Sequence, residues 1–389
     1  MVIIITKMMI HRIQEELIEK RLSSGKAIVM LGPRQTGKTT LMGKIISKLE
    51  NPLVLNCDDP FIRSRLAGSN SAQLRQIIGS HRVVFVDEAQ RVKNIGITLK
   101  LITDQMKDVL LLVSGSSSLE LANEINEPLT GRKFEFMLYP VSWQEFYQHA
   151  GYISAMQQLE LRMVYGMYPE VIAQPGDEKE ILREITGSYL YKDLLSWKGI
   201  RKPEILDKLL KALALQIGNL VSYNELANTI QVDKNTVSNY IDLLEKAFVV
   251  FKLHPFTRNQ RNEISTGRKI YFYDTGIRNA LINNFNLMDS RNDTGALWEN
   301  FMVAERMKFL HYSRKYTGTW FWRNHQQKEI DYIEEADGKI SAFEFKWNPE
   351  KRFKVPSSFA ENYNISDVEV ISRKNFLPFV GVTWKRKFL

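Results

Sequence analysis

The sequence predicts an α/β fold whose first 150 residues form a parallel sheet with helices on both faces. Short β-branched runs alternate with helical stretches throughout this region, which is the pattern of strands joined by helices. The runs are apolar at almost every position, as in strands that are covered on both faces. The clearest predicted strands are residues 27–31, 53–56, 83–86 and 109–114.

The pattern changes twice along the rest of the chain. A helical region follows the first domain, and its apolar positions recur at the spacing of one buried helix face, as at Ile205, Leu209 and Leu213. Strand-like runs then return beyond residue 262, interleaved with a helix near residues 298–310. A length of 389 residues also exceeds what one hydrophobic core usually supports. We therefore expect three domains, at residues 1–150, 151–262 and 263–389.

Bulk composition indicates the kind of partner and compartment. The formal net charge of +9 and the pI near 9.3 favour a polyanionic partner, and nucleic acid, in particular DNA, is the leading candidate. The single cysteine, Cys57, excludes an internal disulfide and a cysteine zinc site, which fits the cytoplasm. No run of about twenty apolar residues occurs, so a membrane span is not expected.

A phosphate-binding loop follows the first predicted strand. Residues 32–39 fit G-x-x-x-x-G-K-[ST] and lead into a predicted helix, which is the context this motif requires. Glycines let consecutive backbone N–H groups face phosphate oxygens, while Lys38 reaches the β- and γ-phosphates and Thr39 binds Mg²⁺. The expected cofactors are ATP and Mg²⁺. The residues expected to contact them are Gly32, Pro33, Arg34, Gln35, Thr36, Gly37, Lys38, Thr39 and Thr40.

An acid pair, Asp87 and Glu88, ends the strand predicted at residues 83–86. Ligands of open α/β sheets bind beyond the carboxyl ends of the strands, where these two side chains are expected. Asp87 is predicted to hold Mg²⁺ through water. Glu88 is predicted to orient or deprotonate the attacking water.

Two further polar groups in this domain are open to two interpretations. Ser114, at the end of the strand predicted at 109–114, could sense the γ-phosphate or position water, or the run from Ser114 to Ser117 could cap the next helix. Arg132 could stabilise the transferring charge from a neighbouring subunit, or be an ordinary surface arginine. The first interpretation of Arg132 implies a homo-oligomer assembled through this domain.

The middle region contains the pattern of a helix-turn-helix. Residues 222–225 form a capping box that opens one short helix, and Asp233 caps a second helix with Val237, Tyr240, Ile241 and Leu244 facing inward. Residues 248–253 would form a β wing. A packing or protein-binding module is the alternative, because only one of the outward side chains is a cation. Those side chains, which could contact phosphates or base edges, are Lys234, Asn235, Ser238 and Asn239.

A hairpin in the last region gathers carboxylates and a lysine. Residues 329–333 and 342–346 alternate like half-buried strands and are joined through Asp337 and Gly338. Glu344 and Lys346 share one face of the second strand. If Asp331 faces the same way, these groups could hold Mg²⁺ and activate water, with Glu299 as a further ligand. The alternative is a surface hairpin with cross-strand ion pairs.

Taken together, these motifs resemble those of a prokaryotic family of AAA-type ATPases that carry a C-terminal domain related in fold to restriction endonucleases. The motifs that carry the resemblance are GPRQTGKTTL at 32–41, VFVDEAQ at 84–90, SGSSS at 114–118, LTGR at 129–132, GMYPE at 166–170, YLYKDL at 189–194, YDTGIRNAL at 273–281, GALWENFMVAE at 295–305, FWR at 321–323, EIDY at 329–332 and FEFK at 343–346.

The resemblance implies ATP hydrolysis, a winged-helix middle region and a core similar to the PD-(D/E)XK nucleases. In such a core, Glu299, Asp331, Glu344 and Lys346 match the catalytic positions. One departure is Ile330, which stands before Asp331 where the motif has proline. Two functions follow: an ATP-dependent DNA-processing enzyme, or an ATP-switched binding protein whose nuclease-like domain is an inert scaffold.

Overall fold

The computed structural model describes residues 9–116, 128–189, 202–257, 267–365 and 367–383. The chain forms two compact units, residues 1–141 with 246–248 and residues 142–245 with 249–389. Most of the motif at 189–194, together with Ser117 and Ser118, lies outside the described residues. The division into three domains stays a prediction.

The first unit is built on a five-stranded sheet in which every pairing is parallel. The predicted α/β fold with a parallel sheet is thereby confirmed. The fifth strand, β5, was not predicted; it lies at one edge of the sheet and pairs with β1. In the order β2-β3-β4-β1-β5, the strands are β2 (Pro52–Asn56), β3 (Val83–Asp87), β4 (Leu110–Ser116), β1 (Ala27–Gly32) and β5 (Lys133–Met137).

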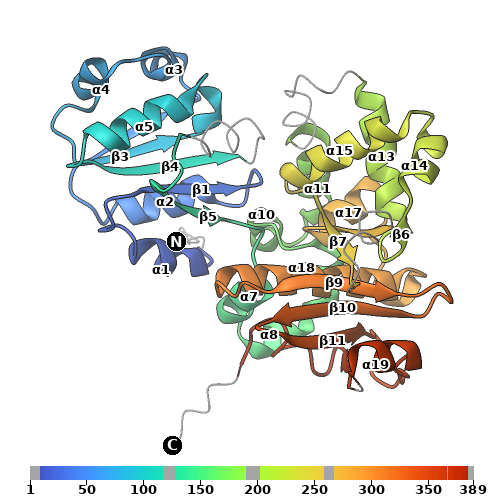
Figure 1. Cartoon of the computed structure of the whole chain (residues 1–389). Helices are drawn as coiled ribbons and strands as arrows, with labels where there is room; N and C mark the ends of the chain where they lie inside the picture. The colour runs from blue at the N-terminus through green and yellow to red at the C-terminus, as the bar shows by residue number, and fades with distance from the viewer. Residues whose placement is uncertain (1–8, 117–127, 190–201, 258–266, 366, 384–389) are drawn as a thin grey trace, which may run out of the picture. The chain divides into compact units, whose positions relative to one another are not determined.

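Helices cover this sheet, with α2 and α5 on opposite faces (Figure 1). Ile28 and Met30 of β1 belong to the same buried cluster as Leu41, Met42 and Ile45 of α2. Burial of these side chains holds α2 against β1, the strand whose carboxyl end leads into the phosphate loop. The helices of the unit are α1 (Ile13–Glu19), α2 (Lys38–Ile46), α3 (Pro60–Leu66), α4 (Ser71–Ile78) and α5 (Ile95–Gln105).

The second unit contains a mixed sheet of seven strands. Its strand β7 pairs antiparallel with β8 and parallel with β9, so the two regions predicted at 151–262 and 263–389 share one sheet. In the order β12-β11-β10-β9-β7-β8-β6, the strands are β12 (Glu369–Ile371), β11 (Lys339–Phe345), β10 (Glu329–Ala336), β9 (Gly318–Arg323), β7 (Val250–Pro255), β8 (Arg268–Phe272) and β6 (Leu220–Val221).

The helices of the second unit precede its sheet in the sequence or connect its strands (Figure 1). Within the described part of the chain, no helix is both long and apolar enough to cross a bilayer. The helices are α7 (Trp143–Ala150), α8 (Tyr152–Gln157), α9 (Leu159–Tyr165), α10 (Pro169–Ala173), α11 (Glu178–Glu184), α13 (Pro203–Leu215), α14 (Tyr223–Ile230), α15 (Lys234–Lys246), α17 (Thr275–Leu281), α18 (Thr294–Tyr312) and α19 (Ser357–Tyr363).

Helices α14 and α15 form where the helix-turn-helix pattern predicts them. The Ser222 hydroxyl accepts from the Glu225 backbone N–H at 3.4 Å, and Asp233 accepts from the Thr236 N–H at 2.9 Å. The apolar residues predicted to face inward on α15 are buried, while Lys234, Asn235 and Asn239 are exposed. The winged-helix assignment and its DNA contacts stay predictions.

The predicted hairpin is formed by β10 and β11. Asp337 and Gly338 both have positive φ, at 51° and 75°, as a two-residue turn of type I′ requires. The antiparallel register pairs Tyr332 with Phe343, and its continuation places Asp331 opposite Glu344. Directly opposite residues have Cβ atoms about 5 Å apart, so these two carboxylates are neighbours across the strands.

Candidate functional site

The loop after β1 depends on glycine at both ends. A Cβ on Gly32, whose φ is +153°, would lie 2.2 Å from the Leu138 carbonyl oxygen. Gly37 has φ +90° and immediately precedes α2, so its N–H lies at the positive end of that helix. Between them, the buried Thr36 hydroxyl donates to the Pro33 carbonyl at 2.9 Å. These contacts hold the loop in the curled shape that the motif predicts.

Lys38 and Arg12 brace the loop from two directions. The buried Lys38 ammonium donates to the carbonyls of Gly32 and Pro33 at 3.0 and 2.8 Å. Arg12, which precedes α1, donates to the Thr36 carbonyl at 2.7 Å and to the Tyr139 carbonyl at 2.6 Å. Arg12 was not predicted, because a single arginine ahead of a helix carries no motif. It links the loop to the segment after β5.

Thr39 and Asp87 meet at the predicted metal position. The Thr39 hydroxyl donates to both carboxylate oxygens of Asp87, at 3.1 and 3.0 Å. Ser114, fully buried within β4, also donates to Asp87. The hydroxyl of Ser114 therefore orients the carboxylate from the neighbouring strand. Whether it also senses the γ-phosphate or positions water stays a prediction, and a helix after Ser116 would lie outside the described residues.

Glu88 is held at the carboxyl edge of the same sheet. Its backbone adopts φ 52°, and its side chain accepts a hydrogen bond from the Gln90 amide at 2.5 Å. The same amide donates to the Ser116 hydroxyl at 2.8 Å. Gln90, which no motif assigned a role, thus links the predicted general base to the end of β4.

Arg132 is not brought to the phosphate loop of its own chain. Its backbone carbonyl accepts from Ala27, the first residue of β1, whereas the loop leaves β1 after Gly32. Five residues of strand separate the two positions by roughly 17 Å. The guanidinium donates to Asp104 at 2.6 Å, and this hydrogen bond lowers the pKa of the Asp104 carboxyl. Action from a neighbouring subunit stays a prediction.

The residues at the end of β1, the start of α2 and the end of β3 have the chemistry needed to bind Mg·ATP. Hard oxygen donors from Thr39 and Asp87 are the ligands that Mg²⁺ prefers, and they lie beside the N-terminus of α2. Lys38 and the backbone N–H groups of residues 34–40 would hold the phosphates, and Glu88 lies next to Asp87.

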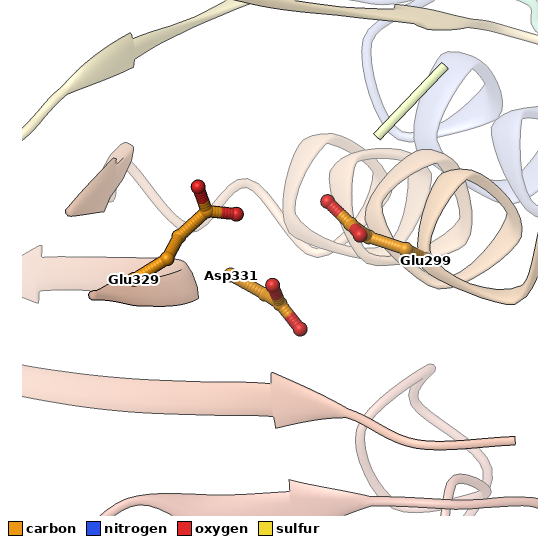
Figure 2. A group of neighbouring side chains, drawn as sticks. All are labelled: Glu299, Glu329 and Asp331. Atoms are coloured by element: carbon orange, nitrogen blue, oxygen red, sulfur yellow. The ribbon is translucent and has the colours of Figure 1, made fainter. Parts of the chain in front are cut away.

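A second cluster of acids lies in the second unit. Glu299 of α18 and Glu329 and Asp331 of β10 each offer one carboxylate oxygen, and these oxygens all lie within 4.8 Å of one another. Figure 2 shows the carboxylates of Glu299 and Glu329 pointing toward each other, with Asp331 between their chain segments. Glu299 and Asp331 were both predicted, whereas Glu329 was not assigned a role.

A buried lysine occupies the middle of this cluster. Lys269 of β8 is fully buried, and its ammonium lies 2.7 Å from Glu299, 3.8 Å from Asp331 and in close contact with Glu329. Burial alone would lower the pKa of Lys269, but the surrounding carboxylates hold it well above its usual value. The Tyr271 hydroxyl donates to Glu299 at 2.6 Å. Sequence analysis missed both residues, because only the sheet brings β8 beside α18.

Asp331, Glu344 and Lys346 come together as the sequence predicts. Asp331 Oδ2 accepts from the Phe345 N–H at 2.9 Å, and the Lys346 ammonium donates to Glu344 Oε1 at 2.5 Å. Glu344 is 4% exposed, and its other oxygen, Oε2, is buried without a hydrogen-bond partner. An orphaned carboxylate oxygen of this kind is costly unless a cation meets it.

Burial and mutual repulsion shift the pKa values of this group. Burial, and then the charge of Asp331, raise the pKa of Glu344 to about 8. Burial also raises the pKa of Glu299 to about 7, against the opposing effect of Lys269. Both shifts come mainly from burial of the carboxyl groups, with a further contribution from the charge of Asp331. Buried acids with shifted pKa values are common at functional sites.

Two of the acids, Glu299 and Asp331, border a cleft of about 300 Å³. Asp331, Glu299 and Lys346 line it, so anionic and cationic side chains face the same space. Thr294 and Gly295, the first residues of the long helix α18, form another part of its wall, where helix N–H groups favour anions. Phe345, Trp347, Asn348 and Lys351 complete the lining.

Three family models match successive parts of the chain. Residues 24–147 match a model described as an AAA domain. Residues 156–287 and 294–377 match two models that are each described as a domain of unknown function, DUF8612 and DUF4143. The AAA match and the loop geometry support a P-loop ATPase, and with it nucleotide binding and ATPase activity in general. The likeness to restriction endonucleases is not among these matches and stays a prediction.

Relatives that match most of this chain in sequence occur in bacteria and archaea. The uncharacterized protein Rv2008c of Mycobacterium tuberculosis is 29% identical over 335 residues, covering 85% of this chain and 72% of the relative. The uncharacterized protein MJ1544 of Methanocaldococcus jannaschii is 24% identical over 344 residues, covering 81% and 74%. Among solved structures, the Walker-type ATPase paby2304 of Pyrococcus abyssi matches with a TM-score of 0.49 at 14% identity, covering 71% of this chain and 97% of its own.

Proposed function

We propose that the chain is a Mg²⁺-dependent ATPase that acts on DNA, and that the cleft of its second unit hydrolyses phosphodiester bonds with the help of a divalent cation. In the first unit, Lys38 and the loop bind the phosphates, and Thr39 and Asp87 hold Mg²⁺. Glu88 accepts the proton of the attacking water.

The observation that carries the nuclease part of the proposal is the free oxygen of Glu344. This oxygen is buried, has no hydrogen-bond partner and belongs to a carboxylate opposite Asp331. A divalent cation held by Asp331 and Glu344 would satisfy it, and its charge would oppose the burial and the charge of Asp331 that raise the pKa of Glu344. When bound, such an ion polarises a phosphoryl oxygen and lowers the pKa of water.

The other groups at the cleft suit a phosphodiester chain. Lys346 and Lys351 provide cations for phosphate oxygens, and the start of α18 adds backbone N–H groups. Trp347 offers an aromatic face beside them, although Arg373 already lies 5.3 Å from its ring centre. The net charge of +9 favours the same polyanionic partner at longer range.

ATP turnover would regulate the cleft. We propose that the nucleotide state of the first unit controls the access of DNA to Asp331, Glu344 and Lys346. A homo-oligomer formed through the first unit would let Arg132 of one copy complete the ATP site of another. Cys57 is a free thiol in the structure, which fits a cytoplasmic protein.

A second candidate function is an ATP-switched regulator of DNA or of a partner protein, with the cleft as a catalytically inert scaffold. The specific observation in its favour is Lys269, which already forms ion pairs with the carboxylates that converge most closely. On this account the acids stabilise the fold rather than hold a metal.

Cutting of DNA by matched variants of the hairpin tests the proposal. We expect the parent to cut labelled duplex or single-stranded DNA with Mg²⁺ or Mn²⁺, and Glu344→Gln to lose this activity. Glu335→Gln, which changes a carboxylate of the same hairpin on β10 that belongs neither to the acid cluster nor to the cleft lining, should cut like the parent. DNA binding should weaken steeply as salt rises. Binding of DNA without cutting by the parent, under every metal condition, would favour the inert scaffold.

A further inference from the structure

The acid cluster of the second unit already contains a cation that belongs to the protein. Three carboxylate oxygens, from Glu299, Glu329 and Asp331, converge as metal ligands do. The Lys269 ammonium lies within 4.0 Å of all three, on a side chain with no exposed surface. A divalent ion placed among the same oxygens would meet this fixed positive charge at close range.

Both carboxylate oxygens of Glu329 are already paired with cations of the protein. One of its oxygens contacts Lys269, and the other accepts from Arg323 at 3.1 Å. Glu299 is engaged through Oε1, which accepts from both Lys269 and the Tyr271 hydroxyl. Oε2 of Glu344 is the oxygen of this group that is buried without a hydrogen-bond partner, and Glu344 lies across the strands from Asp331.

We propose that Lys269 takes the place of a second metal ion, so that the cleft binds one divalent cation, between Asp331 and Glu344. Two-metal sites hold their ions about 4 Å apart and share a carboxylate between them. Asp331 would be the shared carboxylate here. Its Oδ1 lies 3.8 Å from the Lys269 ammonium, and its Oδ2 accepts a hydrogen bond from the Phe345 N–H of β11, the strand that carries Glu344. The ammonium supplies its charge permanently, and Tyr271 and Glu299 fix its position.

This inference rests on the proposed metal site and adds the number of divalent ions that the site binds. Counting Mn²⁺ ions bound by the full chain tests both. To prevent Mn²⁺ from binding to the first unit, the chain carries Asp87→Asn and no nucleotide is added. Electron paramagnetic resonance measures the unbound Mn²⁺, and subtraction from the total gives the number of ions bound per chain. In this background we expect one ion for the parent, two for Lys269→Met and none for Glu344→Gln.

Lys252→Met is the matched control for removal of a lysine. Lys252 lies on the neighbouring strand β7 and is also held by two acids, Asp242 and Glu245. The control should leave one ion bound. A count of one ion in both the parent and Lys269→Met would overturn the inference alone, and so would two ions in the parent. A count of zero in the parent would instead overturn the proposed metal site.

Glu329→Gln keeps the inference testable if Lys269→Met does not fold, which circular dichroism would show. Because Glu329 binds Lys269 and Arg323 rather than the metal, its replacement should leave one Mn²⁺ bound with little change in affinity. A loss of about tenfold or more, the scale seen when groups around a metal are removed, would place the ion in the Lys269 cluster and overturn the inference.

Discussion

The Thr39 hydroxyl donates to both carboxylate oxygens of Asp87, at 3.1 and 3.0 Å. This bond joins the start of α2 to the end of β3, two elements that are 48 residues apart in the sequence. Both side chains are oxygen ligands of the kind that Mg²⁺ prefers, so the loop and the end of β3 place two suitable ligands side by side. The following predictions for the first unit rest on this convergence.

Lys38→Ala should weaken ATP binding by about tenfold to hundredfold, because hydrogen bonds to charged groups contribute about 1.5–3 kcal/mol. Titration calorimetry with ATP and Mg²⁺ measures the change. Lys44→Ala, in the same helix but paired with Glu15, is the control and should bind like the parent. Equal affinity of the parent and Lys38→Ala would contradict the assignment of the loop.

Glu88→Gln should bind ATP but hydrolyse it about a hundredfold to ten-thousandfold more slowly, since proton transfer by a positioned base is worth that much. Steady-state phosphate release, measured beside ATP binding, checks this. Gln90→Ala should cause a smaller loss, because Gln90 orients the Glu88 carboxylate without replacing it. Unchanged turnover in Glu88→Gln would show that Glu88 is not the general base.

Arg132→Ala should lower ATP turnover only where chains associate. The reason is the position of Arg132 beside the start of β1, at the end of the sheet opposite to the phosphate loop. We expect turnover per chain to rise with protein concentration in the parent and to stay flat in the variant. A loss of turnover in dilute samples, shown to be monomeric by light scattering, would contradict action between subunits.

Cys57 should resist thiol reagents until the chain unfolds. Burial raises its pKa to about 12, so almost no thiolate is present at pH 8, and the side chain has no exposed surface. The pKa of the folded thiol exceeds the unfolded value, so its contribution to stability is present below pH 9 and is lost as the pH rises toward 12. Rapid alkylation of folded protein at pH 8, followed by mass spectrometry, would show that this region opens readily.

Local sequence patterns were sufficient to predict four of the five strands of the first unit and its phosphate loop. The strands found as β1, β2, β3 and β4 and the loop at 32–39 were all visible, because parallel strands are continuous apolar runs and the loop has a fixed spacing. The edge strand β5 escaped, since its Lys133 and Glu135 interrupt the apolar pattern.

Contacts between distant segments account for most of what the sequence could not predict. Asp331, Glu344 and Lys346 lie on one hairpin, whose turn residues Asp337 and Gly338 made the register predictable. Lys269, by contrast, reaches the acids only because β7 joins β8 to β9 in one sheet. No spacing along the chain encodes that neighbourhood, and a buried lysine in a strand carries no motif of its own.

The most direct test of the account measures ATP hydrolysis and DNA cutting together. The parent, Lys38→Ala and Lys346→Ala would each be given linear, circular and single-stranded DNA with Mg²⁺ or Mn²⁺, with and without ATP. We predict that the parent cuts DNA in response to ATP, that Lys346→Ala hydrolyses ATP without cutting, and that Lys38→Ala shows no response to ATP. Robust ATP hydrolysis by a parent that cuts none of these DNAs with either metal would contradict the account.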